Sequence, residues 1–322
     1  MRNNETSRRG FIRGILTAAA IPQFAEMRFA RAGHATAGRA QQSVRLGGPI
    51  SGRHDDPEEL ALEHVKLGYR AAYCPAISLA DIARIKAVSA AFDKHGVVIA
   101  EVGRWVNLLD ARAESRQANL KQVTDGLALA EEVGALCCVD IAGSYNPTRW
   151  DGPHPDNISS RFFDEAVANA RTIIDAVKPK RAKFCYEMMG WSIPDSPDSA
   201  LRLLKAVDRE AFAIHLDPCN LINSPERFYR NTDLLRECFD KLGKWIVSCH
   251  AKDLTWEVEA NVHFRETVPG KGSLDYTTYL QLLAQLPHQP PLMMEHLRTP
   301  QEYDEARQHI MKVGKANGIS FE

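Results

Sequence analysis

The sequence predicts a single (β/α)8 TIM barrel over residues 44–322. After residue 43, eight short apolar runs alternate with eight longer amphipathic stretches. This alternation is typical of a parallel α/β architecture. No internal repeat or low-complexity linker marks a second domain, and such barrels fill roughly 250 residues as one domain.

The expected strands are short, apolar and rich in β-branched residues, and they cover residues 44–50, 69–74, 97–102, 136–141, 183–187, 212–217, 245–250 and 292–295. The expected helices repeat apolar residues at helical spacing, and they cover residues 57–67, 79–95, 115–133, 162–177, 199–207, 232–242, 276–286 and 300–316. Residues 254–273 are expected to form an enlarged loop.

A doubly wound open sheet is the rival architecture. It would normally carry a glycine-rich phosphate turn after its first strand. The segment Gly47-Gly48-Pro49 lacks the GxGxxG spacing of that turn. The closed barrel is therefore favoured over the open sheet.

The composition is that of a globular protein, with 44% hydrophobic and 25% charged residues among 322. Net charge is −1 overall, but residues 1–37 carry six arginines against two glutamates. The remainder is therefore acidic, at −5. An acidic body argues against a nucleic acid partner, which would require clustered cations.

The N-terminal residues resemble a twin-arginine export signal. Arg8 and Arg9 precede an apolar run at 15–21, and small residues at 35–37 or 30–32 offer a cleavage site. The run is too short for stable membrane insertion, which needs about 20 residues. We expect residues 1–37 to engage the twin-arginine export machinery and to direct the protein to the periplasm. An amphipathic or disordered tail is the alternative.

Four metal-ligating residue types stand at the carboxyl ends of the last four expected strands: Glu187, Asp217, His250 and Glu295. In an α/β barrel these strand ends open onto one face, so the four side chains are expected to converge. Three carboxylates and one imidazole suit one divalent metal ion, Mn²⁺ first and Mg²⁺ or Co²⁺ as alternatives. Taken singly, each residue is equally compatible with a helix cap or a loop anchor.

The order Glu, Asp, His, Glu on these strands resembles the xylose-isomerase-like barrel superfamily. That group includes ketose 3-epimerases, hydroxypyruvate isomerase, inosose dehydratase and the endonuclease IV branch. The segments HLDPCN (215–220), CHAKD (249–253) and VPGKGSLDY (268–276) are similar to its characteristic stretches. The similarity extends in order over residues 44–316.

The resemblance implies a metal-dependent isomerase or epimerase acting on a small-molecule sugar or keto-sugar. The metal would polarise a carbonyl, and Glu187 and Glu295 would remove and return the neighbouring proton. Asp217 and His250 would hold the ion, with the other ring nitrogen of His250 oriented by an acceptor. One alternative is a lyase that eliminates the glycosidic substituent of a 3-keto-glycoside. Another is a non-catalytic barrel that binds a sugar with the help of the metal.

Three positions depart from the pattern of the ketose epimerases. Asn220 stands where they carry a substrate-binding histidine, Ile193 where they carry a carboxylate, and Trp256 where they carry an arginine. These replacements argue against simple ketohexose epimerisation. Asn220 remains an expected substrate contact. The endonuclease branch would require many more metal-binding histidines.

Lys252 lies two residues after His250, so strand periodicity directs it into the site, where it would contact substrate. The alternative is a lysine that caps the strand-end loop. His215 is expected to point inward one layer deeper, as a hydrogen-bonded core histidine. His296 follows Glu295 and is expected to point away from the site.

Further substrate contacts are expected from Glu101 at the end of the third strand and Trp105 just after it, and from Trp150 and Trp191 after the fourth and fifth strands. Aromatic rings stack on sugars, although exposed tryptophans also pack on neighbouring loops. The seven cysteines contain no CxxC pair, so unpaired buried thiols are expected. A homo-oligomer is neither required nor excluded by the sequence.

Overall fold

The computed structural model describes residues 42–321, and the expected export signal lies outside the described residues. It confirms the predicted closed parallel barrel, in the strand order β11-β2-β3-β4-β5-β6-β7-β8. The barrel strands are β2 (Leu46–Gly47), β3 (Ala71–Tyr73), β4 (Val98–Gly103), β5 (Cys137–Asp140), β6 (Lys183–Glu187), β7 (Phe212–Leu216), β8 (Ile246–Ala251) and β11 (Leu292–Met294).

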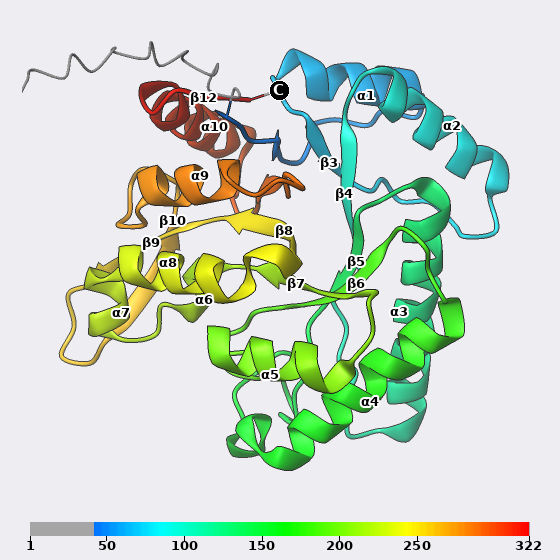
Figure 1. The fold of residues 1–322 in the computed structure, drawn as a ribbon, viewed down its shortest axis with the longest axis vertical. Helices are drawn as coiled ribbons and strands as arrows, with labels where there is room; N and C mark the ends of the chain where they lie inside the picture. Colours follow the sequence, from blue (N-terminus) through cyan, green and yellow to red (C-terminus); the bar gives the residue numbers. More distant parts are fainter. Residues whose placement is uncertain (1–41, 322) are drawn as a thin grey trace, which may run out of the picture. The chain divides into compact units, whose positions relative to one another are not determined.

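Helices lie outside the strands (Figure 1). They are α1 (Pro57–Lys66), α2 (Ile82–Lys94), α3 (Ala113–Val133), α4 (Ser160–Val177), α5 (Pro197–Val207), α6 (Pro218–Leu221), α7 (Pro225–Tyr229), α8 (Asn231–Leu242), α9 (Tyr276–Ala284) and α10 (Pro300–Ala316), with 3-10 turns η1 (Pro155–Ile158) and η2 (Gly243–Trp245). Side-chain caps define where most of them begin, with α3 and α8 as exceptions. In α5, for example, Ser196 and Ser199 form a reciprocal capping box. No helix among the described residues has the length and apolar character that crossing a membrane requires.

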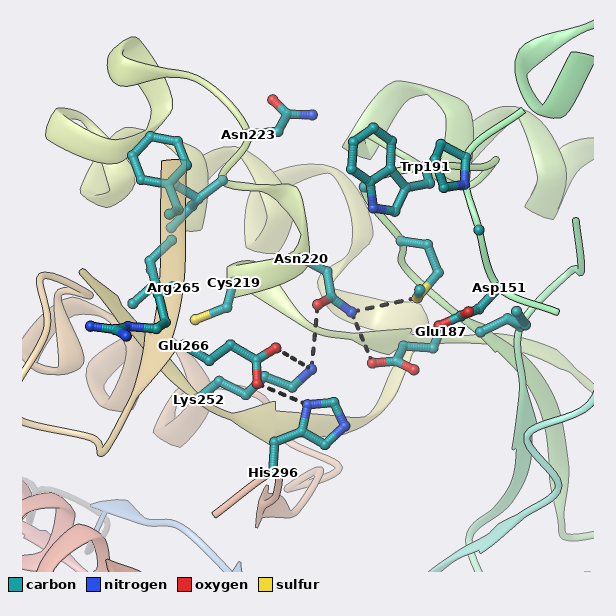
Figure 2. A pocket seen from close by; sticks show the side chains of 18 of the residues that line it. Asp151, Glu187, Trp191, Cys219, Asn220, Asn223, Lys252, Arg265, Glu266 and His296 are labelled. Atoms are coloured by element: carbon teal, nitrogen blue, oxygen red, sulfur yellow. Dashed lines mark hydrogen bonds and ion pairs between the residues drawn. The ribbon is translucent and has the colours of Figure 1, made fainter. Parts of the chain in front are cut away.

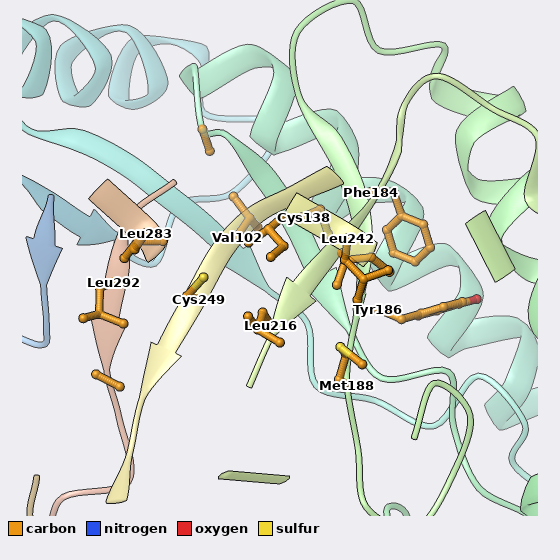
Figure 3. Close-up of a cluster of buried hydrophobic side chains, with 14 of the residues drawn as sticks. Val102, Cys138, Phe184, Tyr186, Met188, Leu216, Leu242, Cys249, Leu283 and Leu292 are labelled. Atoms are coloured by element: carbon orange, nitrogen blue, oxygen red, sulfur yellow. The ribbon is translucent and has the colours of Figure 1, made fainter. Parts of the chain in front are cut away.

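The main core fills the space between the strands and the helices (Figure 3). Outward-facing strand residues such as Val102, Cys138 and Phe184 belong to one buried cluster that also contains helix residues such as Leu242 of α8 and Leu283 of α9. Two smaller clusters of buried residues occur among strand residues; one comprises Cys137, Val139, Cys185 and Ala213, and the other Ala71, Ala100 and Met293. The alternation of strand side chains assigns these smaller clusters to the barrel interior.

Two further pairs of strands stand outside the barrel. β1 (Gln42–Ser43) pairs in parallel with β12 (Ile319–Ser320). β9 (Asp253–Glu257) pairs antiparallel with β10 (His263–Thr267). The prediction of an enlarged loop over 254–273 was therefore wrong for most of its length, which is a β-hairpin. All seven cysteines are free thiols, and six of them are buried.

Candidate metal centre and active site

Glu187, Asp217, His250 and Glu295 come from four strands that are neighbours in the barrel. Glu187 is the last residue of β6 and His250 lies in β8, while Asp217 and Glu295 directly follow β7 and β11. One potential ligand atom from each lies within 4.8 Å of the other three. The structure thus brings together the four side chains that were predicted to converge from their positions at strand ends.

The Nδ1 atom of His250 is the hub of this cluster. It lies 3.1 Å from Glu187 Oε1, 3.5 Å from Asp217 Oδ2 and 2.7 Å from Glu295 Oε1. A single N–H cannot donate to three oxygens at once. Separations near 3 Å are instead those of neighbouring ligands in an octahedron with bonds of about 2.1 Å.

The hydrogen bonding of the cluster also fits a metal ion. Asp217 Oδ2 and Glu295 Oε1 are buried, and no donor is aligned for a hydrogen bond to either, although the Lys252 ammonium lies within 2.8 Å of both. Buried polar atoms are rarely left unpaired, because each costs free energy. The oxygen-rich donor set with one nitrogen is one that divalent Mn²⁺, Mg²⁺ or Co²⁺ accepts. The residues therefore fit a divalent cation.

The charges around the cluster point the same way. Lys252 Nζ lies 2.8 Å from Asp217 Oδ2 and 2.7 Å from Glu295 Oε1. With His250 neutral, as a metal ligand must be, three carboxylates and one ammonium leave two negative charges, which a divalent ion would neutralise. Burial alone would raise the pKa of Asp217, but attraction to Lys252 and His250 lowers it well below its ordinary value.

Attraction acts on the cations of the cluster in the opposite sense. Burial alone would lower the pKa of His250, yet Glu295, Asp217, Glu101 and Glu187 together raise it well above 6.5. Burial opposes the charge of Lys252 too, and the surrounding carboxylates raise its pKa above the ordinary value. Lys252 therefore carries a positive charge beside the ligands.

Glu101 lies beneath the cluster, away from the expected sugar-binding position. It is within β4, 1% exposed, and does not line the cavity described below. Its Oε1 is 3.7 Å from His250 Nε2, and its Oε2 is 3.0 Å from His215 Nε2. Although burial alone would raise it, the pKa of Glu101 is lowered to about 2 by His215 and His250. The residue faces into the barrel one layer too deep to touch substrate. The expectation that Glu101 contacts a sugar was therefore wrong.

Glu101 and His215 form the floor beneath His250. The His215 and His250 rings stand 4.0 Å apart, centroid to centroid, in an edge-on arrangement. His215 thus lies inward and deeper, as its position two residues before Asp217 predicts. With Nδ1 facing the carboxylates, Glu101 is the group placed to orient the other ring nitrogen of His250.

Asn220 links Glu187 to Lys252. Its Nδ2 donates to Glu187 Oε1 at 3.0 Å, and its Oδ1 accepts from Lys252 Nζ at 3.3 Å (Figure 2). Two tyrosines of α9 fix the backbone of the same region, since Tyr279 Oη donates to the carbonyl of His250 and Tyr276 Oη to that of Lys252. These bonds restrict the directions in which the ligand side chains can point.

Asp253 organises the loop that follows the hairpin. Its carboxylate accepts from the backbone N–H groups of Leu254, Gly270, Gly272 and Leu274, at 2.8–3.0 Å. A Cβ at Gly272 would lie 2.2 Å from Asp253 Oδ1, so only glycine fits there. The segment 268–276 is thus held by one buried carboxylate, and its glycines permit the close approach.

A cavity of about 1240 Å³ opens above the cluster. Glu187, Glu295, Asn220 and Lys252 line it, and so do Trp105, Trp150 and Trp191. The three indoles are 38%, 43% and 60% exposed. Every expected substrate contact except Glu101 therefore faces the cavity.

The comparison with protein families identifies this barrel. The family model described as "Xylose isomerase-like TIM barrel" matches residues 59–313. The chain belongs to this family. Among curated protein sequences, none matches it.

Solved structures similar to this family member share its fold at low sequence identity. A xylose isomerase domain protein from Planctomyces limnophilus matches with TM-score 0.62 and 18% identity, over 85% of this chain and 98% of that one. The 3-keto-D-glucoside 4-epimerase of E. coli matches with TM-score 0.60 and 15% identity, over 85% and 99%. A xylose isomerase-like TIM barrel protein from Mycobacterium smegmatis, in complex with magnesium, matches with TM-score 0.60 and 16% identity, over 85% and 97%.

Two of the positions where this member of the family departs from the ketose epimerases do not line the cavity. Ile193 is buried in the hydrophobic core. Trp256 lies on β9, is 49% exposed and is not among the cavity-lining residues. Of the three replacements, only Asn220 lines the cavity.

Sequence reasoning missed two polar residues of the site, Glu266 and His296. Glu266 Oε1 is 3.6 Å from Lys252 Nζ, and Glu266 Oε2 is 2.9 Å from His296 Nδ1 (Figure 2). The prediction that His296 points away was wrong, because its φ of +59° interrupts the extended backbone on which alternation depends. The strand that carries Glu266, HFRET (263–267), has one apolar residue and no alternating burial, so its sequence offered little signal.

Proposed function

We propose that this family member is a metal-dependent sugar isomerase or epimerase that abstracts a proton next to a carbonyl. One observation carries the proposal: the four residues of the cluster divide into two pairs. Asp217 and His250 have fully buried side chains, whereas those of Glu187 and Glu295 are 8% and 15% exposed. Only the two glutamates line the cavity. They are thus placed to meet substrate as well as metal.

When bound, a divalent ion polarises a sugar carbonyl and makes the adjacent C–H more acidic. Glu187 and Glu295 extend from β6 and β11, which are separated in the barrel by β7 and β8. One carboxylate would accept the proton and the other would deliver a proton to the opposite face or to the neighbouring carbon. Opposite-face return gives epimerisation, and return to the neighbouring carbon gives isomerisation.

Lys252 and Asn220 would bind substrate oxygens. The ammonium of Lys252 lines the cavity while contacting Glu295, so it is placed to stabilise negative charge on a substrate oxygen. Asn220 would keep Glu187 in its orientation through the amide hydrogen bond. The metal we propose is Mn²⁺, with Mg²⁺ and Co²⁺ as competitors for the same donors.

The proposal is tested by incubating metal-loaded protein with a panel of free ketoses and 3-keto-glycosides in D₂O. Products are followed by NMR. We expect deuterium at the carbon next to the carbonyl, without cleavage of the sugar. Release of an aglycone would instead identify the lyase reaction. Tight binding without either change would identify a sugar-binding barrel.

We also propose that residues 1–37 direct export to the periplasm through the twin-arginine pathway. The paired arginines and the short apolar run support this, together with the small residues near Ala37. Replacing Arg8 and Arg9 by lysine should block translocation, because an arginine pair is recognised by its guanidinium geometry and not by charge alone. Undiminished periplasmic protein from the double-lysine variant would refute the proposal.

A further inference from the structure

The cavity is larger than one sugar ring requires. Its volume is about 1240 Å³, whereas pockets for drug-sized ligands commonly span about 300–1,000 Å³. A single sugar ring is smaller than such ligands. A monosaccharide bound at the cluster would therefore leave much of the cavity unfilled.

The cavity has a polar end and an aromatic rim. At the polar end, Trp105 stands beside His250, with ring centroids 6.2 Å apart. Figure 2 shows Trp191 on the side of Asn220 remote from Lys252 and His296. Trp150 comes from the segment between β5 and η1 and lines the same cavity. Trp150 and Trp191 are 43% and 60% exposed, whereas the cluster side chains are at most 15% exposed. We call these two exposed indoles together the distal rim.

A buried hydrogen-bond network holds the loop that carries Trp150. Asn107 Nδ2 donates to the carbonyl of Ser144, and its Oδ1 accepts from the Ser144 N–H. Ser144 Oγ and Asn157 Nδ2 both donate to the carbonyl of Gly152, at 2.6 and 3.1 Å. Asn107, Ser144 and Asn157 are at most 4% exposed. Satisfied buried networks of this kind rigidify the segment they hold.

The same network reaches the loop that carries Trp191. The Ile193 N–H contacts the carbonyl of Asn157 at 3.4 Å, and the Met189 N–H donates to the carbonyl of Pro194 at 2.9 Å. On either side of Trp150 in the sequence, Arg149 pairs with Asp151, with Nε and Oδ1 2.7 Å apart. Two large indoles are thus kept exposed on anchored loops. Rigid exposed aromatics of this kind are preorganised to bind a ring.

We propose that the distal rim is a second subsite, which stacks a ring attached to the sugar that reacts at the cluster. The substrate class is then a glycoside with a ring-shaped aglycone, either a second sugar or an aryl group, and not a free monosaccharide. This inference rests on the proposed function for the position of the reacting sugar. The inference adds to the proposed function a second ring of the substrate, which lies beyond the metal-binding cluster.

The test compares three ligands that share one reacting ring: methyl 3-keto-β-D-glucopyranoside, its phenyl analogue and 3-keto-cellobiose. Dissociation constants are measured by calorimetry on manganese-loaded Glu187→Gln protein, which keeps ligands intact. We expect at least one two-ring ligand to bind about tenfold more tightly than the methyl glycoside. The phenyl and glucosyl ligands distinguish an aryl from a sugar aglycone.

Variants locate the subsite. In the same background, Trp150→Ala and Trp191→Ala should each remove most of the two-ring advantage and leave methyl glycoside binding unchanged. Both side chains are substantially exposed, so their loss should not prevent folding. Trp256→Ala is the matched control, because Trp256 is a similarly exposed indole outside the cavity lining, and it should change nothing.

Equal affinity for one-ring and two-ring ligands, or no binding of any of them, would overturn the distal subsite. So would an advantage that survives both cavity variants or disappears in the Trp256 control. Deuterium exchange into any of the three ligands by metal-loaded wild-type protein would still support the proton chemistry. Its absence from all three despite two-ring selectivity would leave the subsite standing and remove the proposed function.

Discussion

Asp140 and Asp217 are both fully buried aspartates at the same edge of the barrel, yet their pKa values are shifted in opposite directions. Asp140 ends β5, and burial raises its pKa well above 3.8. Asp217 follows β7, and despite equal burial its pKa is lowered by Lys252 and His250. Burial is common to both, so the neighbouring cations decide which carboxylate stays ionised.

The alternation of side chains along the strands explains why Lys252 and His250 contact Asp217 and not Asp140. Asp140 pairs in register with Tyr186, whose hydroxyl reaches the carbonyl of Ala166 on α4, outside the barrel. Asp140 accepts from the Val106 N–H and so anchors a loop. Asp217 faces the barrel axis, 3.5 Å from His250 Nδ1. A strand-end carboxylate is therefore a ligand candidate only when its phase turns it inward.

The largest effect expected from this comparison is that of Asp217→Asn. The amide lacks the charge that balances the ion, and its nitrogen cannot bind a metal. We expect the metal dissociation constant to rise more than about 100-fold, beyond the range for residues that act only through a ligand. Elemental analysis after dialysis checks this. Full occupancy in the variant would remove Asp217 from the site.

Glu101→Gln should have the next largest effect. Glu101 lies 3.7 Å from His250 Nε2, so its charge helps to orient the imidazole and keep it a good ligand. We expect metal affinity to fall by about 10–100-fold. Competition against a metallochromic chelator measures it. An unchanged dissociation constant would show that Glu101 pairs with His215 in the core and does not support metal binding.

Asp253→Asn tests a carboxylate that supports the site without touching the cluster. The amide would present N–H groups to two of the four backbone N–H donors that Asp253 now accepts. We expect a loss of about 3 kcal/mol in the free energy of unfolding, from hydrogen bonds to a charged acceptor. Denaturant unfolding measures this. Asp275→Asn is the control, since it keeps a cap oxygen for α9, and an equal loss there would contradict the assignment.

Asp140→Asn should have the smallest effect. Metal affinity should be unchanged, because the carboxyl faces away from the cluster. Since its folded pKa is raised, folding takes up a proton at Asp140, and the contribution of this group to stability falls as pH rises from 3.8 through the raised value. The amide cannot titrate, so the free energy of unfolding of wild type minus that of the variant should decrease with rising pH across that range. A difference that increases with pH would show that Asp140 is ionised in the fold.

Much of this arrangement was predictable from local pattern. The strand at 183–187 and the helix at 300–316 have the predicted bounds, because their periodicity and caps are encoded by adjacent residues. The convergence of Glu187, Asp217, His250 and Glu295 followed from strand order in a barrel. Their position at successive strand ends was visible without coordinates.

The remaining features depend on three-dimensional depth or on exceptions to periodicity. Glu101 lies two residues before the end of β4. This offset places its side chain in the floor beneath His250 and not in the lining of the cavity. The hairpin of β9 and β10 has no glycine or proline in its connection, residues 258–262, so no turn signal marked it. His296 leaves the strand with positive φ, which no alternation rule anticipates.

The central claim is that Glu187 and Glu295 move protons as well as contribute ligands. Glu187→Gln and Glu295→Gln keep the shape and one oxygen donor but cannot accept a proton. With the ketose that exchanges in D₂O, each variant should lower kcat by at least ~10² while retaining metal. One variant should still exchange the hydrogen next to the carbonyl with D₂O, and the other should not, which identifies the initiating base. If both metal-loaded variants turn over within a few-fold of wild type, the glutamates are ligands only and the claim fails.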